Sequence, residues 1–231
     1  MINSKHLISV IMSVYNDEKN IDKSIESIMS QTYKNLELHI LDDGSNDKTW
    51  KIINKYKTEY QNIFIYRNNS NLGLTKSLNY LVDQTNGEII ARHDSDDLSH
   101  PERIEKQLNI MTKYNLDFCT TRAQIIQNNK ITPKFSYYIP KKIVIKYKNP
   151  FIHGTLMIKK RVILNLGMYD ENFYYAQDYK LMTDLLNINS KYKILRTPYY
   201  KLNFENNIST KFKEEQKYYA FCVKKKLTPH S

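Results

Sequence analysis

The stretch that decides the fold of this chain is Glu88-Ile89-Ile90-Ala91-Arg92-His93-Asp94-Ser95-Asp96-Asp97. Its first four residues are typical of a buried strand, and three carboxylates follow close behind. Such a density of negative charge is unfavourable unless a cation, or a ligand that carries one, neutralises it. Hard oxygen ligands favour Mg²⁺ or Mn²⁺ over zinc. Because ligands of open α/β sheets bind beyond the carboxyl ends of the strands, the stretch predicts a cation site at such an edge.

The residues before this stretch alternate between strand and helix patterns. Apolar, β-rich runs predict strands over 7–14, 36–41 and 63–66, besides the strand that ends at Ala91. Apolar side chains recur between them at helical spacing. They are Ile21, Ile25, Ile28 and Met29, then Trp50, Ile53, Tyr56 and Tyr60, then Leu74, Leu78, Leu81 and Val82. This alternation predicts the α/β class, with a Rossmann-like, mostly parallel sheet covered by helices on both faces.

The second half of the chain is less regular. Ser99 and Glu102 fit a capping box, which predicts a helix start there and a helix that carries Ile104, Leu108 and Met111. The remaining expectations are strands over 118–127 and 154–158, a turn over 128–130, no clear period over 132–150, and a helix from about Asp178. Since no repeat and no flexible linker interrupts the chain, we expect one domain over 1–231.

Composition narrows the class of protein. The chain has 231 residues, of which 41% are hydrophobic, as in packed soluble proteins. The run Leu7 to Val14 is too short to span a bilayer and lacks the flanks of a signal peptide, so we expect a cytoplasmic protein. Cys119 and Cys222 are too few for a zinc site and are expected to be reduced and structural.

The formal net charge of +11 favours anionic partners. The chain has no Arg-rich stripe and no recognisable nucleic-acid module, so we expect no nucleic-acid partner. A peripheral contact with an anionic inner membrane is a second expectation, because Lys224-Lys225-Lys226 lies beside Tyr218, Tyr219 and Phe221. An ordinary solvated helix end is the alternative reading of the same residues, and the oligomeric state stays open.

Two further polar turns follow predicted strands. Ser13-Val14-Tyr15-Asn16 ends the first strand, and Asp42-Asp43-Gly44-Ser45 ends the second. In a parallel sheet these turns converge on the same edge as Asp94 to Asp97. A Tyr can stack on a base and an Asp can accept hydrogen bonds from a base or a ribose. The chain has no Gly-rich phosphate loop, so a diphosphate bound here would need a metal to neutralise it.

These motifs, in this order and spacing, resemble the bacterial family 2 glycosyltransferases with the GT-A fold. The resemblance covers about residues 7–212 and rests on six stretches. They are Ile8 to Asn16, Asp42 to Ser45, Asn71-Leu72-Gly73-Leu74, Ala91 to Asp97, Asn149-Pro150-Phe151-Ile152-His153-Gly154-Thr155 and Ala176-Gln177-Asp178-Tyr179. It implies a nucleotide-sugar-binding half over about 1–98 and a smaller acceptor-binding half over about 99–231, which ends in a helical segment.

The resemblance also implies roles at the donor side. Ser13, Tyr15 and Asp43 would contact the uridine of a uridine diphosphate sugar, and Asp42 would support their turn. Lys76 is a candidate phosphate contact, although a solvated helix face is the reading that we favour. The plainer readings are that Tyr15 packs in the core and that the two aspartates only form a turn and a helix cap.

The same resemblance implies a metal and a base. Asp96 would bind Mn²⁺ or Mg²⁺ directly, Asp94 would contact the ribose or the metal shell, and Asp178 would be the catalytic base. A helix-terminal charge is the plainer reading of Asp178, and His153 is expected to orient or pack rather than act as a base. The family often has a metal-side His after the last core strand, whereas this chain has Asn203 there, before residues 206–209.

The expected reaction is inverting, metal-dependent transfer of a hexose or N-acetylhexosamine to a hydroxyl of a surface glycan, such as O-antigen, capsule or lipooligosaccharide. A single displacement needs one general base and no protein nucleophile. The alternative is a degenerate relative that binds a nucleotide sugar without turnover. A sugar-phosphate nucleotidyltransferase is less consistent, since Ser13 to Glu18 contains no Gly.

Overall fold

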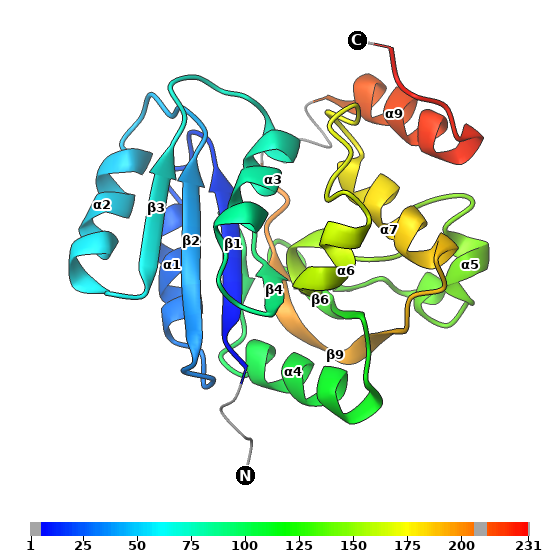
Figure 1. Ribbon diagram of the computed structural model, residues 1–231, viewed down its shortest axis with the longest axis horizontal. Helices are drawn as coiled ribbons and strands as arrows, with labels where there is room; N and C mark the ends of the chain where they lie inside the picture. The colour runs from blue at the N-terminus through cyan, green and yellow to red at the C-terminus, as the bar shows by residue number, and fades with distance from the viewer. Residues whose placement is uncertain (1–5, 206–211, 231) are drawn as a thin grey trace.

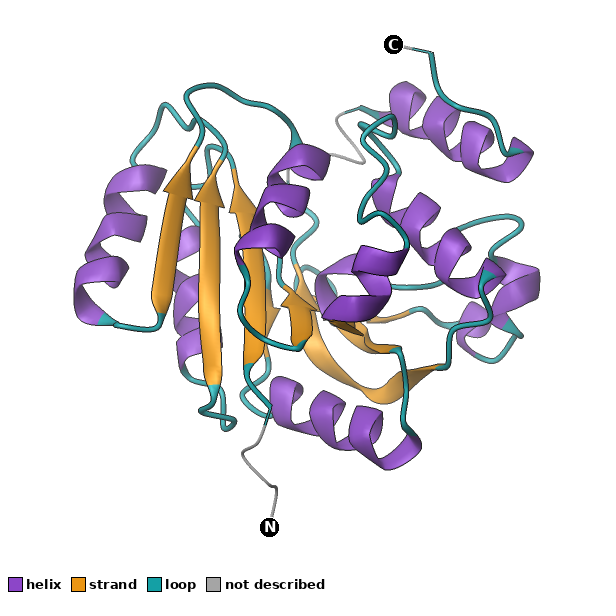
Figure 2. Cartoon of the chain, in the orientation of Figure 1, coloured by secondary structure: helices purple, strands orange, loops and turns teal. Residues whose placement is uncertain are grey.

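The computed structural model describes residues 6–205 and 212–230, and within them one sheet organises the chain (Figures 1 and 2). Its strands run in the order β3-β2-β1-β4-β8-β6-β9-β5, with β7 paired to β6. Their bounds are β1 Ile8–Val14, β2 Leu36–Asp42, β3 Ile63–Arg67, β4 Ile89–Arg92, β5 Leu98–Ser99, β6 Phe118–Ile125, β7 Ile131–Thr132, β8 Met157–Lys159 and β9 Tyr192–Leu202. The expected α/β class is confirmed.

The first four strands form the parallel part of the sheet. β1 pairs with β2 and β4, and β2 pairs with β3, all in parallel register. Parallel strands need a crossover connection, usually a helix, and the chain supplies one after each of the first three strands. These are α1 (Ile21–Met29), α2 (Thr49–Glu59) and α3 (Leu74–Gln84). The carboxyl ends of β1 and β2 therefore lie at one edge, at the top of Figure 1, and the shorter β4 runs in the same direction beside β1.

The second half of the chain extends the same sheet with mixed pairing. β8 is antiparallel to both β4 and β6, while β6 and β9 are parallel with two irregularities in register. The remaining helices are α4 (Arg103–Tyr114), α5 (Lys141–Val144), α6 (Lys160–Asn165), α7 (Gln177–Asn187) and α9 (Lys213–Lys225), with 3₁₀ turns at Phe135–Tyr137 and His153–Thr155. The sheet thus crosses without a break from the first half of the chain into the second.

Two hydrophobic cores cover the two faces of the sheet. Val10 and Met12 of β1 join the first core together with side chains of α1, α2 and α4. Ile11, between them in the strand, belongs to the second core with α3, α6, α7 and α9. Since successive side chains of a strand point to opposite faces, β1 anchors both cores, and helices cover both faces as the sequence predicts.

Two local expectations were wrong. The capping box at Ser99 does not form, because Ser99 pairs with Tyr200 in the β5–β9 ladder and α4 begins only at Arg103, after Glu102. The strand expected from Gly154 starts instead at Met157, because His153–Thr155 forms a 3₁₀ turn.

Two other expectations concern composition. Cys119 and Cys222 are free and buried, as expected. Within 6–205 and 212–230, no helix has both the length and the apolar character required to cross a bilayer.

Candidate functional site

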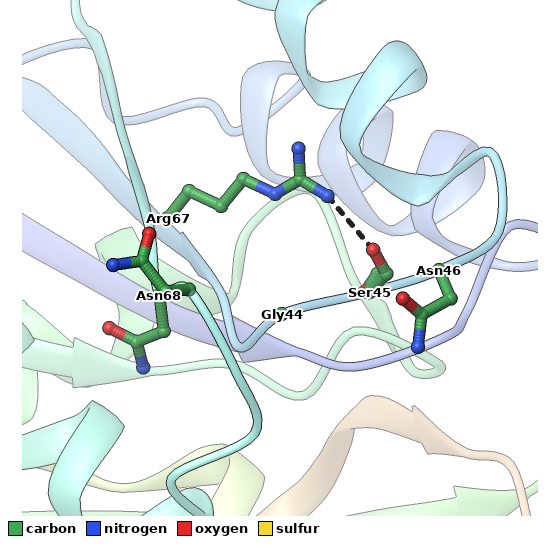
Figure 3. A pocket seen from close by; sticks show the side chains of 6 residues that line it. Gly44, Ser45, Asn46, Arg67 and Asn68 are labelled. Atoms are coloured by element: carbon green, nitrogen blue, oxygen red, sulfur yellow. Dashed lines mark hydrogen bonds between the residues drawn. The ribbon is translucent and has the colours of Figure 1, made fainter.

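The turn after β2 is built around a buried carboxylate. Asp42 is fully buried and forms an ion pair with Arg67 Nε at 3.0 Å. Its Oδ1 accepts the backbone N–H of Ser45 at 3.1 Å, and Arg67 Nη2 donates to the Ser45 carbonyl at 2.9 Å (Figure 3). Asp42 therefore supports this turn, whose outer side, with Arg67 and Asn68, lines an open pocket of about 250 Å³.

Asp43 organises the loop that follows β3. Its Oδ1 accepts from Asn68 Nδ2 at 2.7 Å and from Leu72 N at 2.9 Å, and its Oδ2 accepts from Gly73 N at 2.9 Å. Asp43 is 2% exposed, so these three donors satisfy a buried charge. A carboxylate has about four acceptor positions, which leaves about one for a ligand.

The other predicted donor residues lie around the same edge. Ser13 is buried near the end of β1, and Tyr15, in the turn that follows, is 46% exposed rather than packed in a core. Asn16 connects that turn to the next one, because its N–H donates to Ser45 Oγ and its Oδ1 accepts from Asn46 N. Lys76 is exposed in the first turn of α3. The structure thus brings Ser13 and Tyr15 to the turn that Asp42 supports.

The carboxylate cluster lies beyond β4 and is larger than the sequence predicts. Asp17, which follows the Tyr15 turn, accepts a hydrogen bond from Ser95 Oγ at 2.8 Å and so joins it. Burial, together with the charges of Asp94 and Asp17, raises the pKa of Asp96 to about 7. Burial, together with the charges of Asp94 and Asp96, raises the pKa of Asp97 well above its ordinary value. Without a counterion, these carboxylates resist holding all of their charge.

Buried cations lie beneath this cluster. Arg92 Nη2 contacts Asp94 Oδ1 at 2.6 Å, and Arg92 is almost fully buried. Arg103 is also buried, and its Nη1 donates to the carbonyls of Arg92 and Gly154 at 3.0 and 2.9 Å. Tyr200 lies against Arg103, with 5.2 Å from the guanidinium carbon to the ring centre, and its hydroxyl accepts the Asp94 N–H. This layer therefore fixes Asp94. The charge of Arg92 also acts on the pKa of Asp96, but less than burial and the charges of Asp94 and Asp17 do.

The cluster fits a divalent cation that is shared with a ligand. Among residues 6–205 and 212–230, no three His, Cys, Asp or Glu side chains are arranged to hold a metal alone. Mg²⁺ and similar ions commonly bind one or two protein carboxylates and take phosphate and water as their other ligands. Asp94 and Asp96 supply two hard oxygen donors, and the raised pKa of Asp96 is what a carboxylate that needs a cation would have.

Asp178 lies in the first turn of α7, in the second half of the chain. Its Oδ2 accepts a hydrogen bond from Asn149 Nδ2 at 2.7 Å. His153 Nε2 contacts the Tyr169 hydroxyl at 2.8 Å, and burial and the charge of Arg92 lower the pKa of His153 to about 4. The charges of Asp178 and Asp94 oppose this lowering of the His153 pKa. Because its Nε2 is engaged by the Tyr169 hydroxyl, His153 is suited to an orienting role rather than to that of a base.

Gly154 is the point where the His153–Thr155 turn meets the carboxylate cluster. A Cβ at this position would lie 2.4 Å from Asp94 Oδ2 and 2.5 Å from the Tyr200 hydroxyl oxygen. No side chain larger than hydrogen fits without moving one of them. The absence of a side chain at Gly154 therefore lets the His153 turn approach Asp94.

Asn203 directly follows β9 and holds its neighbours by hydrogen bonds from both its backbone and its side chain. Its N–H donates to Asp97 Oδ1 at 2.7 Å, and its own Oδ1 accepts from Gln127 Nε2 and from Glu205 N. It therefore holds Asp97 and the following turn. Residues 206–209, which follow the position where the family often has a metal-side His, lie outside the described residues.

Sequence reasoning missed several residues of this site. They are Asp17, Arg103, Tyr169 and Tyr200. Asp17 carried one usable signal, since it follows the Tyr15 turn at a strand end. The other three come from elements distant in sequence, and no local pattern marks them.

A strand-edge site of this composition on this sheet defines a nucleotide-sugar transferase of the GT-A type. The match to the family described as Glycosyl transferase family 2 covers residues 9–167, and the chain belongs to that family. It is 39% identical over 186 residues to the O-antigen biosynthesis glycosyltransferase WbnJ of Escherichia coli, covering 78% of this chain and 72% of WbnJ. It is 33% identical over 215 residues to the E. coli UDP-Glc:alpha-D-GlcNAc-diphosphoundecaprenol beta-1,3-glucosyltransferase WfgD, covering 90% and 82%.

A further relative is the putative glycosyltransferase EpsE of Bacillus subtilis, with 35% identity over 175 residues. That match covers 73% of this chain and only 62% of EpsE, so the chain spans less than two thirds of that relative.

Solved structures share the fold at low sequence identity. Staphylococcus aureus TarS 1-349 in complex with UDP matches with a TM-score of 0.74 and 21% identity, over 90% of this chain and 62% of that one. The mannosyltransferase PcManGT from Pyrobaculum calidifontis, in complex with GDP-Man and Mn²⁺, matches with a TM-score of 0.75 and 15% identity, over 98% and 66%. The GT-A fold expected from the sequence is thereby confirmed.

Proposed function

We propose that this chain transfers a hexose or N-acetylhexosamine from a uridine diphosphate sugar to a hydroxyl of a lipid-linked surface glycan, with inversion and with a divalent metal. The proposal is supported by two carboxylate positions from different parts of the chain. Asp94, in the carboxylate cluster after β4, lies so close to Gly154 that a Cβ there would be 2.4 Å from its Oδ2, and Asp178, at the start of α7, is held by Asn149 at 2.7 Å. Such a site separates leaving-group stabilisation from proton removal, as a single displacement requires.

The relatives support this choice of donor and acceptor. The name of WfgD specifies UDP-glucose as donor and an N-acetylglucosaminyl-diphosphoundecaprenol as acceptor, and WbnJ is named for O-antigen biosynthesis. The TarS complexes contain UDP or UDP-GlcNAc, and the PcManGT complex contains GDP-mannose and Mn²⁺. We carry over from these the donor class, the metal and the lipid-linked acceptor.

On the donor side, the chain would hold the nucleoside in the turn around Asp42. Tyr15, which is exposed at the end of β1, is suited to stacking on the base, and the remaining acceptor position of Asp43 to a polar group of the uridine. Asp94 and Asp96 would hold Mg²⁺ or Mn²⁺. When bound, this ion stabilises the negative charge that develops on the departing diphosphate.

On the acceptor side, the chain would supply the base. As the acceptor oxygen bonds to the anomeric carbon, the bond to the diphosphate breaks and the hydroxyl proton passes to the Asp178 carboxylate. Asn149 donates to Oδ2 of Asp178 at 2.7 Å and so fixes the orientation of the carboxylate. His153 stays uncharged near neutral pH, because burial and Arg92 hold its pKa at about 4. Its Nε2 is also engaged with the Tyr169 hydroxyl at 2.8 Å, so we assign the proton to Asp178 and an orienting role to His153.

The outward face of α9 suits the surface on which such an acceptor resides. Cys222 and Val223 pack into the second core, while Phe221 and Tyr218 are 48% and 40% exposed. Lysines 224–226 follow them and are exposed. Exposed aromatic and basic side chains on one helix favour an anionic membrane surface.

Vesicles of phosphatidylglycerol should therefore bind the protein more than phosphatidylcholine vesicles do, and Phe221→Ser should weaken that binding. Equal binding to both lipids would favour an ordinary solvated helix end.

The experiment that tests the proposed function is a donor screen. Nucleoside diphosphate release is measured for each sugar nucleotide, with Mn²⁺ or with a chelator, in the presence of a lipid-linked acceptor extract. We expect release from one uridine diphosphate sugar that depends on the metal and on the extract. Metal-dependent binding of that donor without any release would instead favour the degenerate binding protein.

A further inference from the structure

α3 begins at the donor-side loop. The N–H groups of Leu72 and Gly73 donate to the two oxygens of Asp43, and α3 starts at the next residue, Leu74. Gly73 has a φ of +91°, and a Cβ there would lie 2.4 Å from the Tyr174 ring. The start of the helix is therefore fixed by Asp43 on one side and touches the segment before α7 on the other.

The buried face of α3 binds that same segment by hydrogen bonds. Asn79 is 6% exposed, and its amide is paired with the backbone of Tyr169 in both directions: Nδ2 donates to the carbonyl and Oδ1 accepts the N–H, each at 2.9 Å. Asn79 Nδ2 also contacts Glu171 Oε1 at 3.0 Å. One turn earlier, Thr75 Oγ1 donates to the Phe173 carbonyl at 2.8 Å. The segment is thus held to α3 at three residues.

This segment carries the acceptor-side machinery. The Tyr169 hydroxyl contacts His153, and the segment runs through Ala176, whose φ of +54° turns the chain into α7, to Asp178. In Figure 1, α3 stands between the strands of the first half and the helices α6 and α7 of the second. A displacement of α3 would therefore move the supports of both His153 and Asp178.

We infer that Asn79 is a positioning residue, which joins the donor-side turn at Asp43 to the segment that carries the base. The inference rests on the proposed function, since it takes Asp178 as the base and uridine diphosphate as the ligand of the Asp43 turn. A ligand that orders the Asp43 turn also orders the start of α3, and the paired amide of Asn79 transmits that order to residues 169–178. Donor binding thereby prepares the acceptor side.

The direct test is amide hydrogen exchange on the full chain, because it needs no acceptor. Exchange of residues 169–178 is measured with and without uridine diphosphate and Mn²⁺ in the wild type, in Asn79→Ala and in Thr85→Val. Thr85 is a matched control: it is buried at the end of α3, and its hydroxyl donates only to the Val82 carbonyl among the contacts described. Both variants lose a buried polar interaction on the same helix.

In the wild type and in Thr85→Val, we expect the ligand to slow exchange in 169–178 by about tenfold, a typical strength of coupling between sites. In Asn79→Ala, the ligand should bind within twofold of the wild-type affinity but leave that exchange unchanged. Equal protection in all three proteins would overturn the inference. If the wild type does not bind uridine diphosphate, the proposed function fails instead.

Turnover supplies a second readout once the donor is known. Asn79→Ala should lower kcat by about tenfold or more, because a base displaced by roughly 1 Å can cost up to about 100-fold, while the donor KM stays within twofold. A merely structural role predicts that Asn79→Ala and Thr85→Val lose activity alike, in proportion to their loss of folded protein. That outcome would also overturn the inference.

Discussion

Replacement of Gly154 by alanine places one methyl group between the two halves of the site. The added Cβ would lie 2.4 Å from Asp94 Oδ2, 2.5 Å from the Tyr200 hydroxyl oxygen and 3.0 Å from Tyr200 Cζ. Ordinary contacts are about 3.5 Å, so one neighbour must move by roughly 1 Å. Tyr200 is fully buried between Arg103 and His93 and has no space to move. The carboxylate of Asp94, 29% exposed, is therefore the group that gives way.

Two effects follow from this displacement. Overpacking costs about 1–3 kcal/mol of unfolding free energy, and each kcal/mol lowers the Tm of a domain of this size by about 2–4 °C. Movement of Asp94 also strains its 2.6 Å contact with Arg92 and displaces a metal-side oxygen. We therefore expect the affinity for uridine diphosphate with Mn²⁺ to fall by about tenfold to 100-fold.

Gly167→Ala is the matched control. Gly167 has a φ of +79°, and a Cβ there would have no atom within 4 Å. Alanine at this position costs about 1–2 kcal/mol of backbone strain but touches nothing in the site. Thermal unfolding and calorimetric titration of both variants separate loss of stability from loss of the site. If Gly154→Ala binds uridine diphosphate and Mn²⁺ within twofold of Gly167→Ala, the close approach of Gly154 to Asp94 has no functional meaning.

Three further outcomes are expected. The pKa of Asp96 is raised to about 7 in the folded protein. Between about pH 4 and pH 7, Asp96 therefore keeps a proton in the folded protein that it releases in the unfolded chain. The metal-free protein should consequently lose stability as the pH rises across this range. Thermal unfolding at pH 8 should therefore find metal-free Asp96→Asn more stable than the wild type, by about 1 kcal/mol or more. Titration with Mn²⁺ should find that the same variant no longer depends on the metal for donor binding. Arg67→Met should destabilise the fold by about 3 kcal/mol in denaturant unfolding, since it leaves Asp42 buried without its cation; a loss below about 0.5 kcal/mol would mean that the ion pair supports little.

The parts of the fold that depend on local patterns could be predicted from the sequence. The alternating residues of β1 bury Val10 and Met12 on one face and Ile11 on the other, and helical spacing marked α1 to α3. The polar turns after β1, β2 and β4 meet at one edge because parallel strands bring their carboxyl ends together. Local sequence therefore predicted which turns share this edge of the sheet.

Other features depend on partners far away in the chain. Ser99 has the residue type of a helix cap, but pairing of β5 with β9 draws it into the sheet. The insertion of β8 between β4 and β6 brings Gly154 against Asp94, and Arg103 from α4 beneath both. Asn79 lies 90 residues before its partner Tyr169. No periodicity encodes these contacts, since each exists only after the two halves of the sheet have joined.

The central claim is that one carboxylate pair holds the donor through a metal while a separate carboxylate removes the acceptor proton. The most direct measurement compares Asp178→Asn with the wild type, in calorimetric titration of the uridine diphosphate sugar with Mn²⁺ and in transfer to the acceptor extract. We expect the variant to bind the donor within twofold of the wild type and to lose transfer by about 1,000-fold, within the usual contribution of a general base. Transfer at the wild-type rate by Asp178→Asn would contradict the account.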